Sequence, residues 1–226
     1  LARGEEDRIR PCVGASYCMY KKVACIHNPA TGREQSLPQV IERSPTPGRR
    51  VVVVGGGPGG LEAARVAAER GHRVVLFEAG AKLGGQMLTA VRATWRRDLI
   101  AIVDWRAAEL ARLGVEVRLN VFAEAADILA EAPEVVIVAT GGLPDIDWLE
   151  GGEHCVSVWD VLADATTAKD DVLVYDGTGR HQAVSCALHL AEQGRQVQFV
   201  TLDDNIGLEM EYSARVIYRK RFAERG

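Results

Sequence analysis

The segment Arg49–Glu78 constrains the fold of this 226-residue chain more than any other part of it. An apolar run, Val51–Val54, leads into a turn of five glycines and one proline, and residues 61–70 then have a helical pattern. A second apolar run, Arg73–Phe77, stands directly before Glu78. Strand, glycine turn, helix and strand in this order are typical of a βαβ unit, so the segment predicts an α/β domain with a parallel sheet.

The glycine turn has the spacing G-x-G-x-x-G at Gly55, Gly57 and Gly60. The first glycine allows a tight turn out of the strand, the second lets the backbone approach a pyrophosphate, and the third lets the helix pack closely on the strand. The helix N-terminus then presents free N–H groups and the positive end of its dipole to the phosphates. The turn predicts a Rossmann-like dinucleotide-binding domain; the alternative is a glycine-rich turn without a ligand.

Glu78 ends the second strand, about 20 residues after the turn, where a carboxylate accepts hydrogen bonds from a ribose hydroxyl. A carboxylate in that place repels a 2′-phosphate, so the expected ligand is FAD, ADP or NAD rather than NADP. Two strands, a helix and a terminal acid around the glycines make this prediction stronger than a glycine motif alone.

Two further glycine segments follow, Gly84-Gly85-Gln86 and Ala139–Gly142. The second comes after Val135–Val138, which we expect to be a buried parallel strand, and glycines there allow a ligand to approach the carboxyl edge of the sheet. A turn without a ligand is the alternative for this segment. Between the two segments we expect a long helix at 95–113 with Trp95 and Trp105 as packing anchors, a strand at 115–119 and a short helix at 123–130.

The last third of the chain predicts another strand–helix–strand unit, with strands at 171–175 and 196–201 and a helix at 181–192. Aligned on the first unit, Asp176, Thr178 and His181 stand at the three glycine positions. A shift by one residue recovers Gly177 and Gly179 but leaves Gln182 at the third position. A carboxylate beside a pyrophosphate is a like-charge contact, so this half is expected to be a structural relic rather than a working NAD(P) site. His181 and His189 are expected to be surface or packing residues.

Composition excludes several classes of protein. The chain is 47% apolar and 26% charged with a formal net charge of −4, which is ordinary for a soluble globular protein and lacks the basic excess of a polyanion binder. No apolar run approaches the ~20 residues of a membrane helix, and the first residues have no secretory signal. We expect a cytoplasmic protein. Because the chain begins at Leu1 and stops at Gly226 in charged stretches, we expect an internal piece of a longer polypeptide.

Three of the five cysteines, Cys12, Cys18 and Cys25, lie in one short segment. In a reducing compartment such a group indicates a metal site more often than disulfides. Cys155 and Cys186 are isolated, and both are expected to be small buried hydrophobic residues.

The cysteine segment carries a family resemblance. Residues 9–14, Ile-Arg-Pro-Cys-Val-Gly, then Cys18, then residues 25–34, Cys-Ile-His-Asn-Pro-Ala-Thr-Gly-Arg-Glu, resemble the linker of the trimethylamine dehydrogenase/2,4-dienoyl-CoA reductase family. Those proteins join an FMN-bearing old-yellow-enzyme barrel to a glutathione-reductase-like nucleotide module, and the linker binds a 4Fe–4S cluster near the pattern C-x2-C-x3-C-x11-C. The glycine segments and Glu78 extend the resemblance over nearly the whole chain, which looks most like the N-methylproline demethylase-type branch.

The resemblance implies three regions: an iron–sulfur-type linker at 1–45, after a missing FMN barrel, an FAD- or ADP-binding Rossmann-like domain at 46–165, and a partial, degenerate NAD(P)-binding-like subdomain at 166–226. The connector Ser44-Pro45-Thr46-Pro47-Gly48 supports the first boundary. The candidate cofactor-binding residues are Gly55, Gly57, Pro58, Gly59, Gly60, Glu78, Gly84, Gly85, Gln86, Thr140 and Gly141, and the candidate metal ligands are Cys12, Cys18 and Cys25.

The linker departs from the family pattern in two ways. Ala15 stands where the second cysteine belongs, and the interval from Cys18 to Cys25 is about five residues shorter than in the family, so a cluster would need a fourth ligand and a loop that still reaches around it. The alternatives are a zinc site formed by Cys12, Cys18, Cys25 and His27, or a site that has been lost.

By resemblance, the chain is expected to be the FAD- or ADP-binding and electron-transfer portion of an FMN and iron–sulfur oxidoreductase acting on C–N bonds. The alternatives are a portion of an NAD(P)H-dependent enoate or 2,4-dienoyl-CoA-type reductase, a non-catalytic ADP-binding structural module, and a zinc-clipped interaction domain. No residue of the chain has a clear catalytic role, because the cofactors carry the chemistry. The expected partners are a small-molecule substrate of the full-length protein, an electron-transfer partner and a second copy in a homo-oligomer, but neither nucleic acid nor a membrane.

Overall fold

The computed structural model describes residues 4–19 and 23–225. Its contacts divide the chain into two compact units. The first takes in the chain up to Val13, His27–Leu88 and Asp98–Gly142, and the second takes in Gly14–Ile26, Thr89–Arg97 and the chain from Leu143 onward. The division at residues 45 and 165 remains a sequence-based prediction.

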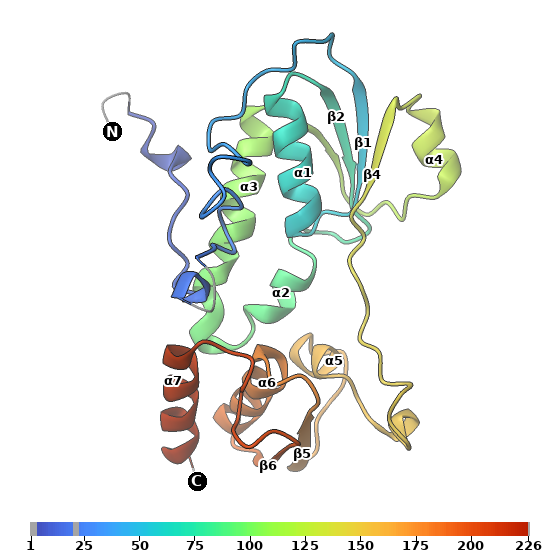
Figure 1. Ribbon diagram of the computed structural model, residues 1–226. Helices are drawn as coiled ribbons and strands as arrows, with labels where there is room; N and C mark the ends of the chain where they lie inside the picture. The colour runs from blue at the N-terminus through green and yellow to red at the C-terminus, as the bar shows by residue number, and fades with distance from the viewer. Residues whose placement is uncertain (1–3, 20–22, 226) are drawn as a thin grey trace. The chain divides into compact units, whose positions relative to one another are not determined.

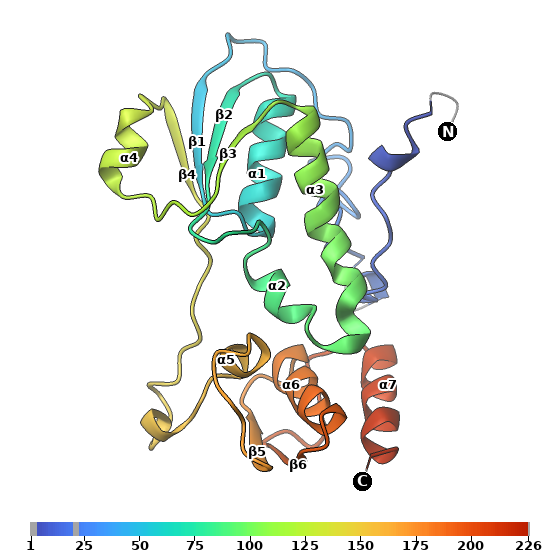
Figure 2. The ribbon, with the colours of Figure 1, turned by 180° about the vertical axis from the view of Figure 1, so that it is seen from behind.

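Within the described residues, four parallel strands form the sheet of the first unit, in the order β3-β2-β1-β4 (Figures 1 and 2). They are β1 (Arg50–Val54), β2 (Arg73–Phe77), β3 (Glu116–Arg118) and β4 (Val135–Val138). Val51 of β1 pairs with Val74 of β2 on one side and with Val135 of β4 on the other. The parallel sheet confirms the α/β, Rossmann-like fold class, and the glycine turn leaves the sheet at the carboxyl end of a central strand.

Helices pack against both faces of this sheet. Successive residues of β1 point to opposite faces, so they belong to two different clusters. Val51 and Val53 pack in one cluster with α1 (Pro58–Glu69) and α3 (Ala101–Arg112). Val52 lies in a second cluster, against which Ile128 of α4 (Ala125–Ala130) packs. Figure 2 shows α1 and α3 on one side of the sheet and α4 on the other.

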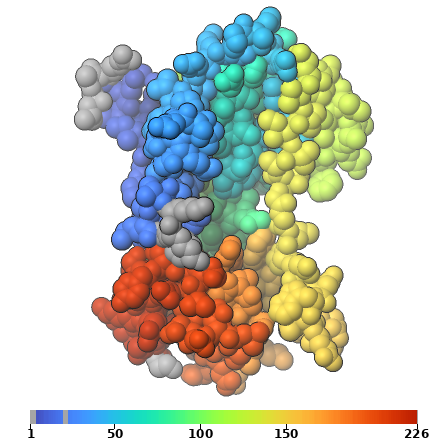
Figure 3. All heavy atoms as spheres, in the orientation of Figure 1, coloured from blue at the N-terminus to red at the C-terminus, as the bar shows by residue number. Residues whose placement is uncertain are grey.

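Two details differ from the sequence-based expectation. The helix expected at 95–113 is a 3₁₀ segment, Thr94–Ile100, followed by α3, and the short α2 (Gln86–Ala90) precedes both. The expectation that Val135–Val138 is buried was wrong, since the side chains of Val136 and Val138 are 42% and 70% exposed. β4 is an edge strand in the described sheet. The face that carries Val136 and Val138 is therefore less covered by packing than the faces of a central strand. Figure 3 shows α4, in yellow-green, at the surface of the same region.

The second unit contains a two-stranded parallel sheet of β5 (Asp171–Asp176) and β6 (Gln196–Thr201), joined by α6 (His181–Glu192). These three elements confirm the strand–helix–strand prediction. The short α5 (Val158–Leu162) contributes Leu162 to the cluster under α6, and α7 (Tyr212–Ala223) contributes Tyr218 to a neighbouring cluster. The remaining described elements are short 3₁₀ turns at Glu6–Arg8, Tyr17–Met19 and Gly152–His154.

The two isolated cysteines behave differently. Cys186 is buried within α6, as expected, and burial raises the pKa of its thiol to about 12. Cys155 is exposed, so the expectation that it is a buried residue was wrong. Its position follows the Gly152–His154 turn, whose residues Glu153 and His154 are exposed, and the surrounding sequence has no periodic pattern that would have shown this.

A polar group lies inside the second unit around Tyr218. The Tyr218 hydroxyl is 2.7 Å from the Ser185 hydroxyl, and the Tyr218 ring meets the Trp95 ring edge to face at 4.7 Å. His181 lies beside Tyr218 and contacts Arg96 at 2.9 Å. Burial, followed by the charge of Arg96, lowers the pKa of His181 to about 3. His181 is therefore a packing residue that is neutral at pH 7.

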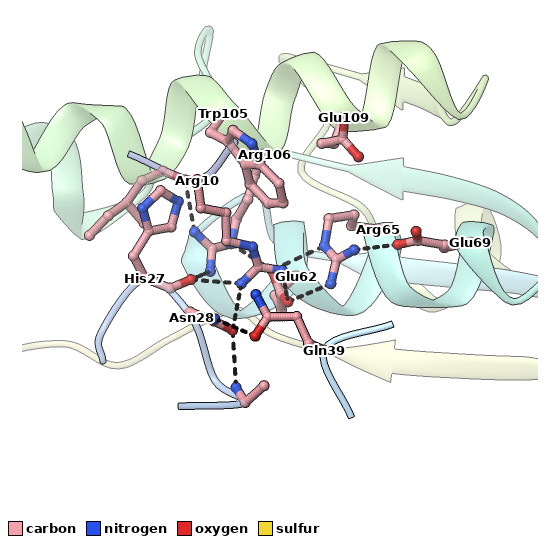
Figure 4. Close-up of polar contacts among 12 residues, drawn as sticks. Arg10, His27, Asn28, Gln39, Glu62, Arg65, Glu69, Trp105, Arg106 and Glu109 are labelled. Carbon is pink, nitrogen blue, oxygen red and sulfur yellow. Dashed lines mark hydrogen bonds and ion pairs between the residues drawn. The ribbon is translucent and has the colours of Figure 1, made fainter. Parts of the chain in front are cut away.

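In the first unit, one carboxylate on α1 gathers three arginines. Glu62 accepts hydrogen bonds from Arg106 of α3 at 2.9 Å, from Arg65 at 2.8 Å and from Arg10 at 3.1 Å (Figure 4). Arg10 also lies over the Trp105 ring, 4.3 Å from its centre, which agrees with the packing role expected of Trp105. Burial alone would raise the pKa of Glu62, but the hydrogen bond from Arg65 and the charges of the arginines lower it.

This cluster also fixes the chain on either side of the cysteine segment. Both Arg10 and Arg106 donate to the carbonyl oxygen of His27, at 2.9 and 2.8 Å. The Nδ1 atom of His27 lies 3.0 Å from the carbonyl oxygen of Pro11. The residues just before Cys12 and just after Cys25 are therefore held together on the surface of α1 and α3. Burial lowers the pKa of His27 and favours its neutral form.

Among the described residues, no helix is long and apolar enough to cross a membrane.

We predict that Glu62→Gln lowers the free energy of unfolding by about 3 kcal/mol, because it leaves three partly buried guanidinium groups without their common carboxylate. Urea denaturation followed by circular dichroism measures this change. The matched control is Glu116→Gln, whose carboxylate is exposed and pairs with Arg118, and it should cost less than about 1 kcal/mol. Equal losses in the two variants would contradict the importance of the cluster.

His181 generates a prediction about pH. Its pKa is lowered in the folded state, so below about pH 6.5 the unfolded chain takes up a proton that the folded chain does not, and stability falls with decreasing pH until about pH 3. Between pH 7 and pH 5 this group should remove about 2 kcal/mol. Denaturation curves at both pH values should show a smaller loss for His181→Asn than for the parent. His154→Asn, which changes an exposed histidine, should keep the parent's pH dependence; a parent-like loss in His181→Asn would refute this assignment.

Candidate nucleotide-binding site

The turn between β1 and α1 is built on two glycines that the chain itself requires. Gly55 has φ +108°, and a Cβ atom on it would lie 2.3 Å from the carbonyl oxygen of Ala139. A Cβ atom on Gly60 would lie 1.8 Å from the carbonyl oxygen of Gly55. No side chain fits at either distance, so these two glycines let α1 begin close to the strands.

Two further glycines of the turn, Gly57 and Gly59, are not required by the packing. A Cβ atom on Gly57 would meet only the Cα atom of Gly85, at 4.0 Å, and one on Gly59 would meet no described atom within 4 Å. Gly57 has φ −73°, which every residue tolerates. The missing side chains therefore leave open space at the N-terminus of α1, and no described side chain caps this end of the helix. This arrangement is suited to a phosphate group that approaches the backbone.

Glu78 closes one side of the turn. Its carboxylate accepts hydrogen bonds from the backbone N–H groups of Gly56 and Gly80, both at 2.6 Å. The sequence assigned this side chain to a ribose, and the structure adds that it also braces the turn. A carboxylate has about four acceptor positions, so two remain for hydroxyl groups.

The two later glycine segments lie against the same turn. Gly84 donates to the carbonyl oxygen of Gly56 at 2.8 Å, and a Cβ atom on Gly85 would lie 3.1 Å from the Cα atom of Gly57. The Gln86 side chain donates to the carbonyl oxygen of Gly142 at 3.0 Å and stands beside Gly141. Segments that lie far apart in the sequence thus meet at the carboxyl edge of β1, β2 and β4.

The structure brings all the candidate cofactor-binding residues to this edge and adds one that the sequence reasoning missed. Gly56 donates to Glu78 and accepts from Gly84. A Cβ atom on it would lie 2.7 Å from the Leu83 side chain and 2.8 Å from the Glu78 carboxylate. The motif allows any residue at position 56. In the sequence, only the place of Gly56 between two motif glycines could have indicated that it belongs to the site.

The cysteine segment gives a different result. Cys12 and Cys18 are exposed, and Cys25 is half-buried. In the described part of the chain, no three histidine, cysteine or acidic residues are gathered as a metal site, which applies to the zinc set with His27 as well. Cys12 belongs to the first unit and Cys18 and Cys25 to the second, so the iron–sulfur site remains a sequence-based prediction.

Comparison with known proteins agrees with the nucleotide-binding geometry. Residues 50–125 match the family described as FAD dependent oxidoreductase. A multifunctional alkene reductase/demethylase from Caballeronia cordobensis is 51% identical, covering 88% of this chain and 30% of the relative. A probable N-methylproline demethylase from Rhizobium meliloti is 46% identical, covering 93% of this chain and 32% of the relative.

A solved structure extends the likeness to three dimensions. The 6-hydroxypseudooxynicotine amine oxidase from Pseudomonas geniculata aligns with a TM-score of 0.91 at 27% identity, covering 100% of this chain and 37% of that one. The chain thus spans about a third of the length of the relatives it matches. Residues 50–125 carry the FAD dependent oxidoreductase match, and these relatives confirm the resemblance to the trimethylamine dehydrogenase/2,4-dienoyl-CoA reductase flavoproteins that the sequence indicated.

Proposed function

We propose that this chain is the FAD- or ADP-binding and electron-transfer portion of a flavin oxidoreductase that acts on C–N bonds. The observation that carries the proposal is the contrast within the glycine turn. Gly55 and Gly60 are demanded by backbone contacts, whereas Gly57 and Gly59 face open space at a helix N-terminus. A diphosphate explains the absence of side chains at the two positions where the protein itself does not.

The chain's own residues account for binding and orientation. The backbone N–H groups at the start of α1 face the diphosphate, and the helix dipole favours its negative charge. Glu78 accepts hydrogen bonds from ribose hydroxyls, and the Gly84–Gln86 and Thr140–Gly141 segments line the approach along the edge of the sheet. A bound flavin supplies the redox chemistry, whereas the protein positions it and sets its electrostatic surroundings.

The C–N specificity rests on the relatives. The N-methylproline demethylase and the amine oxidase are named for reactions at carbon–nitrogen bonds. By this proposal, an FMN-bearing barrel in the rest of the protein binds the small-molecule substrate. Electrons then leave the barrel toward the nucleotide module and an electron-transfer partner.

The first test concerns the nucleotide. Gly57→Val places a branched side chain where the diphosphate must approach, and it should reduce the retained nucleotide at least about tenfold. The circular dichroism spectrum should stay unchanged, because the nearest described atom to the new Cβ is 4.0 Å away. Nucleotide is released by heat and quantified per mole of protein. Ala130→Val, which introduces the same side chain at an exposed position of α4, is the control and should retain the parent's amount; parent-like retention by Gly57→Val would refute the site.

The second test concerns the cysteine segment. We propose that Cys12, Cys18 and Cys25 ligate a labile, oxygen-sensitive cluster, because thiolates are soft ligands that suit iron–sulfur clusters. Anaerobic reconstitution with iron and sulfide should give a visible chromophore and a paramagnetic signal on reduction, and Cys18→Ser should lose both. Cys155→Ser, which removes an exposed thiol outside the segment, is the control. Equal iron in the parent and Cys18→Ser, or stoichiometric zinc in the isolated protein, would overturn the proposal.

A further inference from the structure

The turn after β5 holds a buried carboxylate where the turn after β1 has a glycine. Asp176 ends β5 and is 2% exposed. Its Oδ1 atom accepts hydrogen bonds from the backbone N–H groups of Thr178 and Gly179, both at 3.0 Å. The Thr178 hydroxyl donates to the same oxygen at 3.1 Å. Three donors of the turn thus converge on a single anionic oxygen.

This is the arrangement in which a helix N-terminus holds a phosphate oxygen. The turn leads directly into α6, whose N-cap, Arg180, makes no capping hydrogen bond with its side chain among the described residues. The difference from the first turn is that the anion belongs to the protein. The donors that a ligand would need are already bound to Asp176.

A second segment covers the turn from the other side. Gly179 has φ +63°, and a Cβ atom on it would lie 2.7 Å from the Asp203 carboxylate. The backbone N–H of Glu209 donates to the carbonyl oxygen of Gly179 at 3.0 Å. The loop after β6 therefore lies on the turn, and it brings a second carboxylate close to the position that a diphosphate would take.

The buried carboxylate is only partly satisfied. The Oδ2 atom of Asp176 is buried and has no hydrogen-bond partner among the described residues. A buried carboxylate oxygen without a partner is unfavourable. Apolar packing does not explain why an acid stands at position 176. Hydrogen bonding of the Asp176 carboxylate to the donors of the turn does explain it.

We infer that Asp176 is an internal substitute for the phosphate of a ligand and that it determines the exclusion of a dinucleotide from the second half of the chain. The sequence had suggested that a carboxylate here would only repel a pyrophosphate. The geometry gives Asp176 a more direct role, since its carboxylate binds the hydrogen-bond donors of the turn and fills the space that a phosphate would occupy. The inference deepens the proposed function: a nicotinamide nucleotide held in this half does not supply electrons to the protein.

The test is a gain of binding. Asp176→Gly, which copies Gly55, frees the N–H groups of the turn, and it should bind ADP-ribose at least about tenfold more tightly than the parent in calorimetric titration. The measurement is made in the Gly57→Val background, so that the first turn cannot take up the probe. Asp176→Asn removes the charge but keeps an acceptor in the same place, and it should gain much less. An equal gain in Asp176→Asn would show repulsion instead of occupation, and no gain in Asp176→Gly would overturn the inference.

Hydrogen exchange of the parent gives a second test that needs no variant. The amide hydrogens of Thr178 and Gly179 should exchange slowly, because the buried carboxylate holds them. Added ADP-ribose should leave their rates unchanged. Fast exchange of both amides, or protection that appears only with ADP-ribose, would refute occupation by Asp176. The titration compares variants that share the Gly57→Val background, and the exchange experiment reads only the amides of Thr178 and Gly179. Failure of either test is therefore distinct from failure of the proposed function.

Discussion

The close approach of α1 to the strands is the constraint on which the first unit depends. It requires that neither Gly60 nor Gly55 carry a side chain, because their Cβ atoms would lie 1.8 and 2.3 Å from backbone oxygens. The approach aims the N-terminus of α1 at the edge of the sheet. It also brings the end of β4 against the turn, since the oxygen next to Gly55 is that of Ala139. The position of the site therefore follows from backbone packing before any ligand is considered.

The same helix anchors the chain that flanks the cysteines. Glu62 lies one turn into α1, and the arginines it gathers bind the carbonyl oxygen of His27. Removing one partner from such a group of partly buried charges is destabilising, because the remaining charges are left uncompensated. The helix that faces the nucleotide at its N-terminus thus holds both ends of the cysteine segment on its side.

The two glycine-containing turns have the same topology, and the residue at one position determines whether the turn is free to bind a ligand. Both follow a strand and lead into a 12-residue helix. After β1, the first position is Gly55 and the helix N-terminus faces open space. After β5, Asp176 takes the donors of the turn. The helix dipole favours an anion in both cases, and the sequence decides whether that anion is a ligand or a side chain.

The sequence by itself determined the βαβ units, the parallel sheet and the glycines of the first site, because local periodicity and backbone freedom are properties of neighbouring residues. Only the tertiary structure decided that Gly57 is open whereas Gly60 is packed, since their surroundings come from distant segments. It also decided that Val138 at the sheet edge is exposed, that Glu62 gathers arginines from three segments, and that Asp176 fills its own turn. Partners of this kind are brought together by folding, and no spacing along the chain records them.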